Sequence, residues 1–457
     1  MLKFYSSSAK DFIDFVPQDP KNVKIYTCGP TVYSYAHIGN LTAYIYWDFL
    51  IRTLTLNGYQ VNRVLNYTDV GHLASDADDG EDKLEKGAKK EGSTVWQIAE
   101  KYISAFEKDF AALNLTPPQK IARATDYIVE EQDLVNRLVE KGYTYETSDG
   151  IYFDTTKFPA YADFAKLDLE NLKAGARVEM SSEKKHPSDF AVWKFIKEGE
   201  DHAMQWDFLG RPGYPGWHLE CATIIHAELG GTIDIHTGGI DHIPIHHTNE
   251  IAEYVCAYDK KLANFWLHNN FITVDGEKIS KSLGNTYTLA DLKEKGYHPL
   301  DYKMWVLQGQ YRTERNFSFD NLAAAKNRRL AWRNRIAECY QTEHQARQTT
   351  SPEYPPLDQN TLLAIASHDL NSAEVLSKID NSALSFADWE YVDALLGLDL
   401  IKTTPKISEP LAQKIQERET ARKSQDYQKA DQLRDELAAE NITVLDTDHG
   451  PIWQYLS

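Results

Sequence analysis

Two short strings of residues constrain the fold of this 457-residue chain more than any other feature. The first, His37-Ile38-Gly39-Asn40, follows an apolar run at residues 23–27 and opens a segment with helical periodicity. A strand that leads into a helix places backbone N–H groups and the helix dipole at one point, which is a site for phosphate. The second string, Lys278-Ile279-Ser280-Lys281-Ser282, lies between two glycines and predicts a cationic loop that can close over a polyphosphate.

The first half of the chain alternates between strand-like and helix-like segments, which predicts an α/β fold. Strands are expected at residues 23–27, 61–67, 150–153, 232–235 and 271–274, and long helices after residues 37 and 94. Beyond residue 317 the pattern becomes helical, with a final helix expected at residues 410–440 and a short strand at 442–445. We therefore expect a Rossmann-type nucleotide-binding domain with an inserted connective domain, then a helical bundle and a small α/β C-terminal module.

These pattern changes predict six segments along the chain. They are a first catalytic half (1–114), a connective insertion (115–204), a second catalytic half (205–270), a region that carries the lysine loop (271–315), a helical bundle (316–402) and the C-terminal module (403–457).

The composition limits the compartment and the partners. The N-terminus lacks the apolar core of a signal peptide, and no apolar run reaches the ~18 residues of a membrane span. Four scattered cysteines are too few for a disulfide scaffold and are available as metal ligands. We expect a cytoplasmic monomer that has no membrane partner.

The formal net charge of −19 argues against nucleic-acid binding over the whole surface. Two stretches are nevertheless rich in lysine and arginine, and either could contact RNA or form an ordinary solvated helix face. The basic residues are Lys326, Arg328, Arg329, Arg333 and Arg335 in the first stretch, and Arg418, Arg422, Lys423, Lys429 and Arg434 in the second.

Four residues could form a metal site. Cys28 ends the first expected strand, Cys221 lies far downstream, and His246 and Glu250 would share one face of a helix. Two thiolates, one imidazole and one carboxylate make a four-coordinate zinc set. Spacing alone leaves this open, because a buried cysteine is most often an inert core residue.

Several blocks of this chain resemble those of bacterial-type cysteinyl-tRNA synthetases, which belong to the class I aminoacyl-tRNA synthetases. In addition to the two strings, they lie at residues 26–33, 66–69, 216–221, 246–250, 430–435 and 450–453. The chain departs from the family at Asn40, where His is common, at residues 236–241, where the glycine-rich turn differs, and in a longer segment at 71–91.

The resemblance implies a two-step reaction in which ATP and L-cysteine give cysteinyl-adenylate, and the cysteinyl group then passes to tRNA(Cys). It also implies one Zn²⁺ per chain, and ATP implies Mg²⁺. For the tRNA, the resemblance implies a stem-contact region at residues 271–315 and an anticodon-binding module at residues 403–457. The implied catalytic residues are His37, Asn40, Lys278 and Lys281, and the implied metal ligands are Cys28, Cys221, His246 and Glu250. The implied ATP site consists of Gly39, Gly238, Gly239, Asp241, Ser280, Ser282 and Lys281. The implied cysteine pocket consists of Gly29, Thr31, Thr68, Trp217 and His218.

A metal in this pocket has a chemical rationale. A hydrophobic pocket separates near-isosteres such as cysteine and serine by only about 1–3 kcal/mol. Zinc binds a thiolate strongly and a protonated hydroxyl poorly at neutral pH, so it would distinguish the two without an editing domain.

Two alternative functions remain open at this stage. One is a ligase that activates cysteine in the same way and transfers it to a small aminosugar. The other is an inactive RNA-binding relative, although both loop lysines and all four metal candidates are present in this chain.

Overall fold

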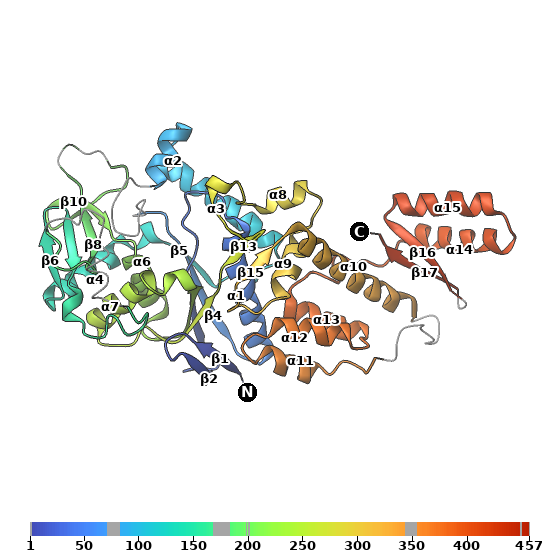
Figure 1. The fold of residues 1–457 in the computed structure, drawn as a ribbon, viewed down its shortest axis with the longest axis horizontal. Coiled ribbons are helices and arrows are strands. Elements are labelled where there is room, and N and C mark those ends of the chain that lie inside the picture. The colour runs from blue at the N-terminus through green and yellow to red at the C-terminus, as the bar shows by residue number, and fades with distance from the viewer. Residues whose placement is uncertain are drawn as a thin grey trace.

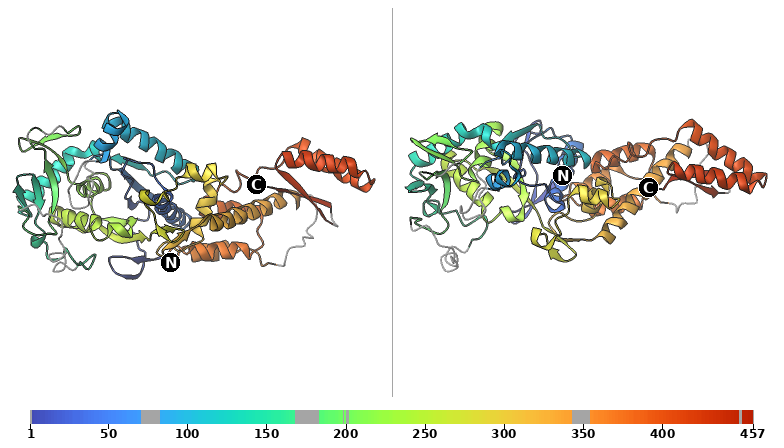
Figure 2. Two further views of the ribbon diagram at one scale, coloured as in Figure 1. Left: turned by 45° about the horizontal axis from the view of Figure 1, so that its top comes forward. Right: turned by 90° about the horizontal axis from the view of Figure 1, so that it is seen from above.

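The computed structural model describes residues 2–70, 83–167, 183–197, 199, 202–342, 354–447 and 450–456. The molecule is elongated, with an inserted sheet at one end and the C-terminal module at the other (Figures 1 and 2). Among the helices of these residues, none combines the length and apolar character needed to cross a membrane.

A five-stranded parallel sheet forms the centre of the fold, in the order β12-β11-β3-β4-β5. Its strands are β3 (Val23–Thr27), β4 (Val61–Tyr67), β5 (Lys120–Arg123), β11 (Ile233–Gly239) and β12 (Ala263–Asn269). The chain runs from β3 to β5 on one side and later returns to place β11 on the other side of β3. In such sheets, ligands bind beyond the carboxyl ends of the strands where the order reverses. Cys28 and Gly238 lie at this position.

Helices cover both faces of this sheet, because alternate side chains of each strand point to opposite faces. Ile25 and Leu65 pack with α1 (Ile38–Leu56) and α3 (Val95–Ala112), whereas Tyr26 and Val64 pack on the opposite side. That side is covered by α4 (Ile128–Glu140), α6 (Leu219–Ile224) and α7 (His246–Tyr258). The prediction of an α/β nucleotide-binding fold is confirmed.

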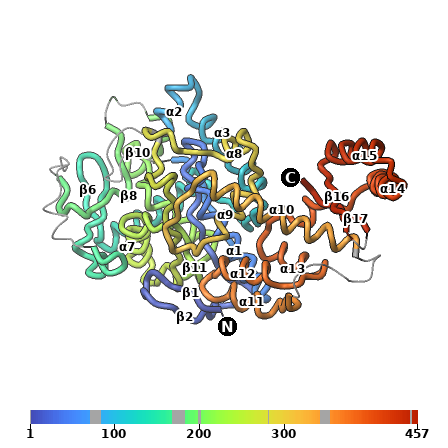
Figure 3. Tube along the Cα trace, turned by 45° about the vertical axis from the view of Figure 1, so that its right-hand side comes forward, coloured from blue at the N-terminus to red at the C-terminus, as the bar shows by residue number. Residues whose placement is uncertain are grey.

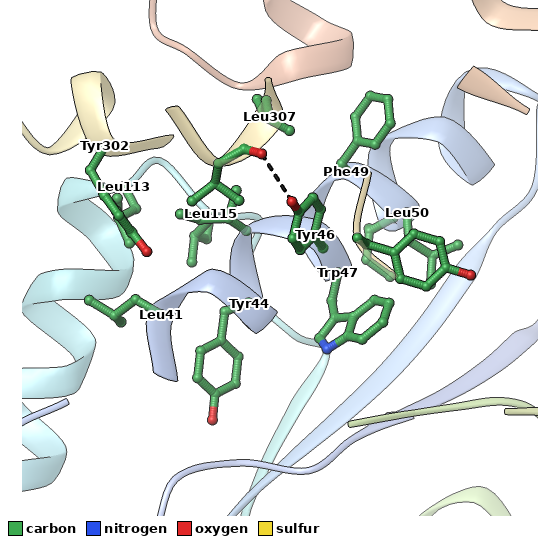
Figure 4. Packing of buried hydrophobic residues seen from close by; sticks show 14 of the residues in the cluster. Leu41, Tyr44, Tyr46, Trp47, Phe49, Leu50, Leu113, Leu115, Tyr302 and Leu307 are labelled. Carbon is green, nitrogen blue, oxygen red and sulfur yellow. Dashed lines mark hydrogen bonds between the residues drawn. The ribbon is translucent and has the colours of Figure 1, made fainter. Parts of the chain in front are cut away.

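Helix α1 is buried along most of its length because later helices pack on the side that the sheet leaves free. Tyr46, Trp47 and Leu50 lie in this core, and the Tyr46 hydroxyl donates to the Val306 carbonyl at 3.0 Å (Figure 4). Val306 belongs to α9 (Pro299–Leu307). The first nucleotide string therefore begins a helix that is fixed from all sides.

The insertion forms a separate, antiparallel sheet in the order β6-β7-β8-β10-β9. Its strands are β6 (Thr144–Thr147), β7 (Gly150–Phe153), β8 (Phe190–Phe195), β9 (Trp206–Phe208) and β10 (Arg211–Pro215). The sheet continues past the expected boundary at residue 204, and β5 lies in the central sheet although it follows the expected boundary at 114. The domain boundaries as a whole stay a prediction.

Shorter elements connect these layers. They are β1 (Lys3–Ser6) and β2 (Asp11–Asp14), which form an N-terminal hairpin; α2 (Lys83–Glu91); β13 (Ile272–Val274), β14 (Glu277–Lys278) and β15 (Arg315–Phe317), which form a small sheet; and α8 (Leu289–Glu294). Of the longer segment at residues 71–91, residues 71–82 lie outside the described part of the chain.

The second half of the chain is helical, as predicted. It contains α10 (Phe319–Thr342), α11 (Gln359–Ala366), α12 (Ser372–Asp380) and α13 (Phe386–Leu396). Helix α10 extends beyond this bundle toward the C-terminal module, which projects from the rest of the molecule (Figure 3). Asn334 of α10 accepts a hydrogen bond from the Tyr455 backbone N–H at 2.9 Å and so joins the two.

The prediction of one final helix at residues 410–440 is wrong. The module contains a helical hairpin of α14 (Glu409–Lys423) and α15 (Tyr427–Ala439), and a strand pair of β16 (Ile442–Thr447) and β17 (Gly450–Tyr455). Gln425 takes the left-handed conformation (φ 61°), and the Asp426 side chain caps α15 by accepting from the Lys429 N–H. Capping residues of this kind start a new helix.

A buried ion pair fixes α1 to α9. Lys303 Nζ lies 2.8 Å from Asp48 Oδ2, and both side chains are almost fully buried. Burial lowers the pKa of Lys303 to about 8, although the Asp48 carboxylate partly opposes this shift. Arg52 and the Thr116 backbone N–H also bind Asp48.

We expect Lys303→Met to destabilise the protein by about 3–5 kcal/mol, because it leaves a buried carboxylate short of a partner. The exposed Lys402, 3.4 Å from Asp399, provides the matched control, and Lys402→Met should cost less than about 1 kcal/mol. Denaturant unfolding at neutral pH measures both. Equal losses in the two variants would contradict this account.

Candidate active site and metal centre

The first string begins α1. His37 occupies the N-terminal cap position, and the Asn40 side-chain oxygen accepts a hydrogen bond from the His37 backbone N–H at 3.2 Å. Asn40 is exposed, at the positive end of the helix dipole. The departure from His at this position therefore gives the helix a capping residue and keeps a polar side chain at the surface.

The second string lies directly against the first. A Cβ atom on Gly39 would come within 2.9 Å of Ile279 Cδ1, and the Ile38 backbone N–H donates to the Tyr287 carbonyl at 2.8 Å. The two strings, about 240 positions apart in the sequence, thus form one surface. A larger residue at position 39 would therefore require the Ile279 and His37 side chains to shift.

A turn shapes the lysine loop. The Asn285 side chain accepts from the Ser280 backbone N–H at 2.8 Å and donates to the Lys278 carbonyl at 3.1 Å. The hydroxyls of Ser280 and Ser282 lie 3.0 Å apart. Lys278 is exposed, whereas the side chain of Lys281 lies outside the described part of the chain. Asn285 is a loop-shaping residue that the sequence analysis did not identify.

The residues expected at the adenosine lie at the end of β11. Gly238 has no room for a side chain, because a Cβ there would lie 2.6 Å from the His247 ring. A Cβ on Gly239 would come 2.2 Å from Asp241 Oδ1. The space beside both glycines is therefore filled by side chains of this chain, which pack directly against the backbone at the end of β11.

The four expected metal ligands come together. Each offers one atom, and these atoms of Cys28, Cys221, His246 and Glu250 lie within 4.8 Å of one another in a buried site. His246 Nε2 lies 3.0 Å from Glu250 Oε1 and 3.5 Å from Cys221 Sγ. Cys28 follows β3, Cys221 lies on α6, and the other two are one turn apart on α7.

A second, overlapping set of donors shares two of these ligands. It consists of Cys28, His236, His247 and Glu250, also within 4.8 Å of one another. His236 Nε2 lies 2.8 Å from Glu250 Oε2, and His247 Nε2 lies 3.3 Å from Cys28 Sγ. The sequence analysis missed both histidines, although His247 adjoins His246 and His236 is an unusual polar residue in a buried strand.

Burial and close neighbours shift the pKa values in this cluster. For Glu250, burial raises the pKa, but His236 and His246 outweigh it and lower the pKa to about 2. Burial lowers the pKa of His247 to about 4. The pKa of Cys221 is raised by burial, whereas for Cys28 the Cys221 thiol and nearby imidazoles overcome burial and lower the pKa.

The donor set fits a metal cation. Buried carboxylates and thiolates are costly unless they are paired or coordinate a metal, and in this buried site Cys28 Sγ lies 4.0 Å from Glu250 Oε1. Cys28, Cys221, His246 and Glu250 supply the mixture of sulfur, nitrogen and oxygen ligands that zinc accepts. His218 Nδ1 lies 2.8 Å from His246 Nδ1, the position from which an outer residue orients a ligating imidazole.

The residues expected in the cysteine pocket surround this cluster. The Thr68 hydroxyl donates to Glu220 at 2.6 Å, and the Gly29 backbone N–H donates to the Asn66 side chain at 2.8 Å. Thr31 forms a bridge with Thr68, and the Trp217 ring stacks on His246 with centroids 5.0 Å apart. Their roles toward a substrate stay predictions.

Most arginines of the two basic stretches bind carboxylates or carbonyls of this chain. Arg329 binds Asp301 at 2.7 Å, Arg333 donates to the Thr403 carbonyl, and Arg418 forms a two-point pair with Asp446. All three are more than nine-tenths buried. For these arginines the structural interpretation holds, because each one joins its helix to another segment of this chain: α9, the turn at Thr403 and strand β16.

Comparisons with known families agree with this architecture. Residues 14–327 match the family model described as the class I (C) tRNA synthetase catalytic domain. Residues 404–453 match the cysteinyl-tRNA ligase anticodon-binding domain.

Curated relatives are similar over the whole chain. A cysteine–tRNA ligase of Treponema denticola is 36% identical over 493 aligned residues and covers 100% of both chains. One from Burkholderia lata is 39% identical and covers 98% of this chain and 96% of its own. Among solved structures, Mycobacterium tuberculosis methionyl-tRNA synthetase in complex with methionyl-adenylate has a TM-score of 0.57 at 16% identity, and covers 83% of this chain and 88% of its own. This last similarity concerns the fold alone.

We expect the purified protein to hold about one metal ion. Cys221→Ser should weaken metal binding by more than about 100-fold, because even the loss of a residue outside the ligand set changes metal affinity 10–100-fold. Cys339 is the control, since its thiol donates to the Arg335 carbonyl on α10, outside this cluster. Elemental analysis and chelator competition measure the difference. A protein that keeps its metal in the Cys221 variant would contradict the ligand assignment.

Proposed function

This chain belongs to the cysteine–tRNA ligases of the class I synthetases, and from that premise we propose how it selects and activates its substrate. It catalyses ATP-dependent activation of L-cysteine and transfer of the cysteinyl group to tRNA(Cys). We propose that it selects cysteine over serine with a zinc ion held by Cys28, Cys221, His246 and Glu250, and that it acts as a cytoplasmic monomer.

One observation carries this proposal: four buried ligand atoms converge at the carboxyl ends of β3 and β11. A zinc ion bound there would supply a soft Lewis acid that accepts a thiolate and discriminates against a hydroxyl. Trp217, stacked on His246, would cover the adjoining pocket and exclude water.

The activation step rests on positioning and charge. The N-terminus of α1, with His37 and Asn40, would face the triphosphate, and Gly238 and Gly239 at the end of β11 would lie at the adenosine together with Asp241. Asn285 holds the turn that carries Lys278, so that the loop can stabilise charge as it develops on the phosphates. Mg²⁺ would accompany the ATP.

The acceptor is tRNA rather than a small aminosugar. The match of residues 404–453 to an anticodon-binding domain supports this, because a small acceptor would have no anticodon for that module to bind. Cysteine-dependent exchange of pyrophosphate into ATP, followed by charging of tRNA(Cys), tests the whole proposal. Exchange that serine supports equally well would refute the selection mechanism.

Lys281→Ala should lower the rate of adenylate formation by about 10²–10³-fold and leave the KM for ATP nearly unchanged, because the charge acts mainly in the transition state. Single-turnover measurement of adenylate formation gives the rate. Lys295→Ala, in an exposed lysine after α8, is the control. An unchanged rate for Lys281→Ala would exclude the proposed role.

The exposed lysines of the C-terminal module should act on RNA affinity alone. Lys423 and Lys429 are exposed, unlike the buried Arg418. Replacing both with Glu should weaken tRNA binding and lower its salt dependence by about one unit of slope for each phosphate that is no longer neutralised. Cysteine-dependent exchange should stay unchanged in the same variant. Normal tRNA affinity at all salt concentrations would place the RNA-binding surface elsewhere.

A further inference from the structure

A half-exposed tyrosine lies at the rim of the active site. Tyr35 belongs to the loop of residues 28–37, which begins with the proposed metal ligand Cys28 and ends with His37, the cap of α1. Two residues of chain span at most about 7 Å, so Tyr35 lies within that distance of His37. Its side chain is 52% exposed. A large aromatic surface is thus open to solvent close to the first nucleotide string.

Hydrogen bonds hold this loop along the carboxyl edge of the central sheet. The Val32 backbone N–H donates to the Thr68 carbonyl, and the Thr68 N–H donates to the Pro30 carbonyl, both at 3.1 Å. Thr68 follows directly after β4. The loop therefore runs from the expected cysteine pocket to the N-terminus of α1, and Tyr35 lies between the two.

Two side chains of α3 contact the Tyr35 ring. The Tyr102 ring lies nearly perpendicular to it, with the centroids 4.9 Å apart and the planes at 85°. Lys101 Nζ lies 5.7 Å from the centroid of the Tyr35 ring. Glu91, the last residue of α2, accepts hydrogen bonds from Lys101 at 2.7 Å and from the Tyr102 hydroxyl at 3.3 Å. The contacts hold the exposed ring in place before a ligand arrives, which lowers the cost of binding.

The sheet order separates Tyr35 from the expected adenosine site. Helix α3 connects β4 to β5, and Arg123 at the end of β5 pairs with Glu100 of α3 at 2.8 Å. Tyr35 packs on this helix and therefore lies on the β4–β5 side of β3. The adenosine is expected at Gly238 and Gly239, at the end of β11 on the other side of β3. The adenine of ATP is thus not the group that this ring contacts.

The remaining substrates differ in what they offer to an aromatic ring. L-cysteine has no planar group that stacks, whereas the 3′ end of tRNA is a single strand that must reach the adenylate during transfer. Unpaired bases stack on exposed aromatic side chains, and nearby basic residues neutralise the phosphates between them. Helix α2, which packs against α3 (Figure 1), carries four lysines and two glutamates in an otherwise acidic protein.

We propose that Tyr35 is a tRNA-binding residue: its exposed ring stacks on a base of the single-stranded 3′ end and so holds the terminal ribose near the cysteine pocket. This inference rests on the tRNA-charging function stated above. It adds a contact for the acceptor end that is separate from the anticodon-binding module. It also gives a role to α2, which lies in the longer segment at residues 71–91, because Glu91 holds the two residues that contact Tyr35.

The test compares two RNAs at one fixed salt concentration: intact tRNA(Cys), and the same tRNA without its single-stranded 3′ end. Tyr35→Leu removes the aromatic face, and Tyr35→Phe keeps it. Phe12→Leu is the matched control, because Phe12 on β2 is also exposed (40%) and belongs to the N-terminal hairpin. Affinities are measured with the full-length proteins, and thermal unfolding verifies that each variant keeps its fold.

The parent should bind the intact tRNA more tightly than the shortened one. Tyr35→Leu should weaken binding of the intact tRNA by about 10-fold, the order expected for the loss of one stacked base, and should bind the shortened tRNA as the parent does. The kcat/KM for charging of intact tRNA should fall by a similar factor. Tyr35→Phe and Phe12→Leu should match the parent with both RNAs.

If Tyr35→Leu keeps the full preference for intact tRNA, or weakens binding of both RNAs equally, the ring does not hold the 3′ end and the proposal is wrong. A parent that binds both RNAs equally well contradicts it too. If the parent binds neither RNA and charges no tRNA, the proposed function fails, and this inference fails with it.

Discussion

The carboxylate of Glu250 is the contact on which the rest of the site depends. It is fully buried, with one oxygen 3.0 Å from His246 and 4.0 Å from Cys28, and the other 2.8 Å from His236. A buried carboxylate is tolerated only with such partners. Since α7 starts at His246, Glu250 lies one turn into that helix and faces the carboxyl ends of β3 and β11. The fold thereby brings donors from four segments to one point.

Buried polar contacts outside the site keep its surroundings fixed. Lys303 and Asp48 fix α9 to α1, and Arg329 binds Asp301 at the start of α9. Asp369 accepts from Tyr5, Tyr311 and Arg312, and so joins the N-terminal hairpin to the helical bundle. Breaking one member of such a network is costly because the other stays buried. The helix that carries the first nucleotide string and the N-terminal hairpin are both held in this way.

The sequence could predict those features of the fold that depend on the local pattern of residues. The strand–helix junction before His37 and the alternation of strands indicated the parallel sheet, and the bounds of β3 and β4 agree with the expected ones. The four metal candidates were identified through a family resemblance, and the structure brings them together.

The rest required the three-dimensional arrangement. Three histidines are buried in the core: His236 on β11, His247 on α7 and His268 on β12. A histidine in such a position is ordinarily a core residue, so nothing in the sequence showed that these three face one another. The break at Gln425 depends on a single left-handed residue and the cap at Asp426. In the sequence, Arg418 is one of several basic residues on a helix, and only the folded module brings it to Asp446 on β16.

The central claim is that a metal ion in the cysteine pocket recognises the substrate by binding its sulfur atom. X-ray absorption at the zinc edge measures this directly, because it counts the sulfur atoms bound to the metal. The account predicts two sulfur ligands in the free protein, from Cys28 and Cys221, a third when L-cysteine is added, and no change with L-serine. A sulfur count that L-cysteine leaves unchanged would contradict it.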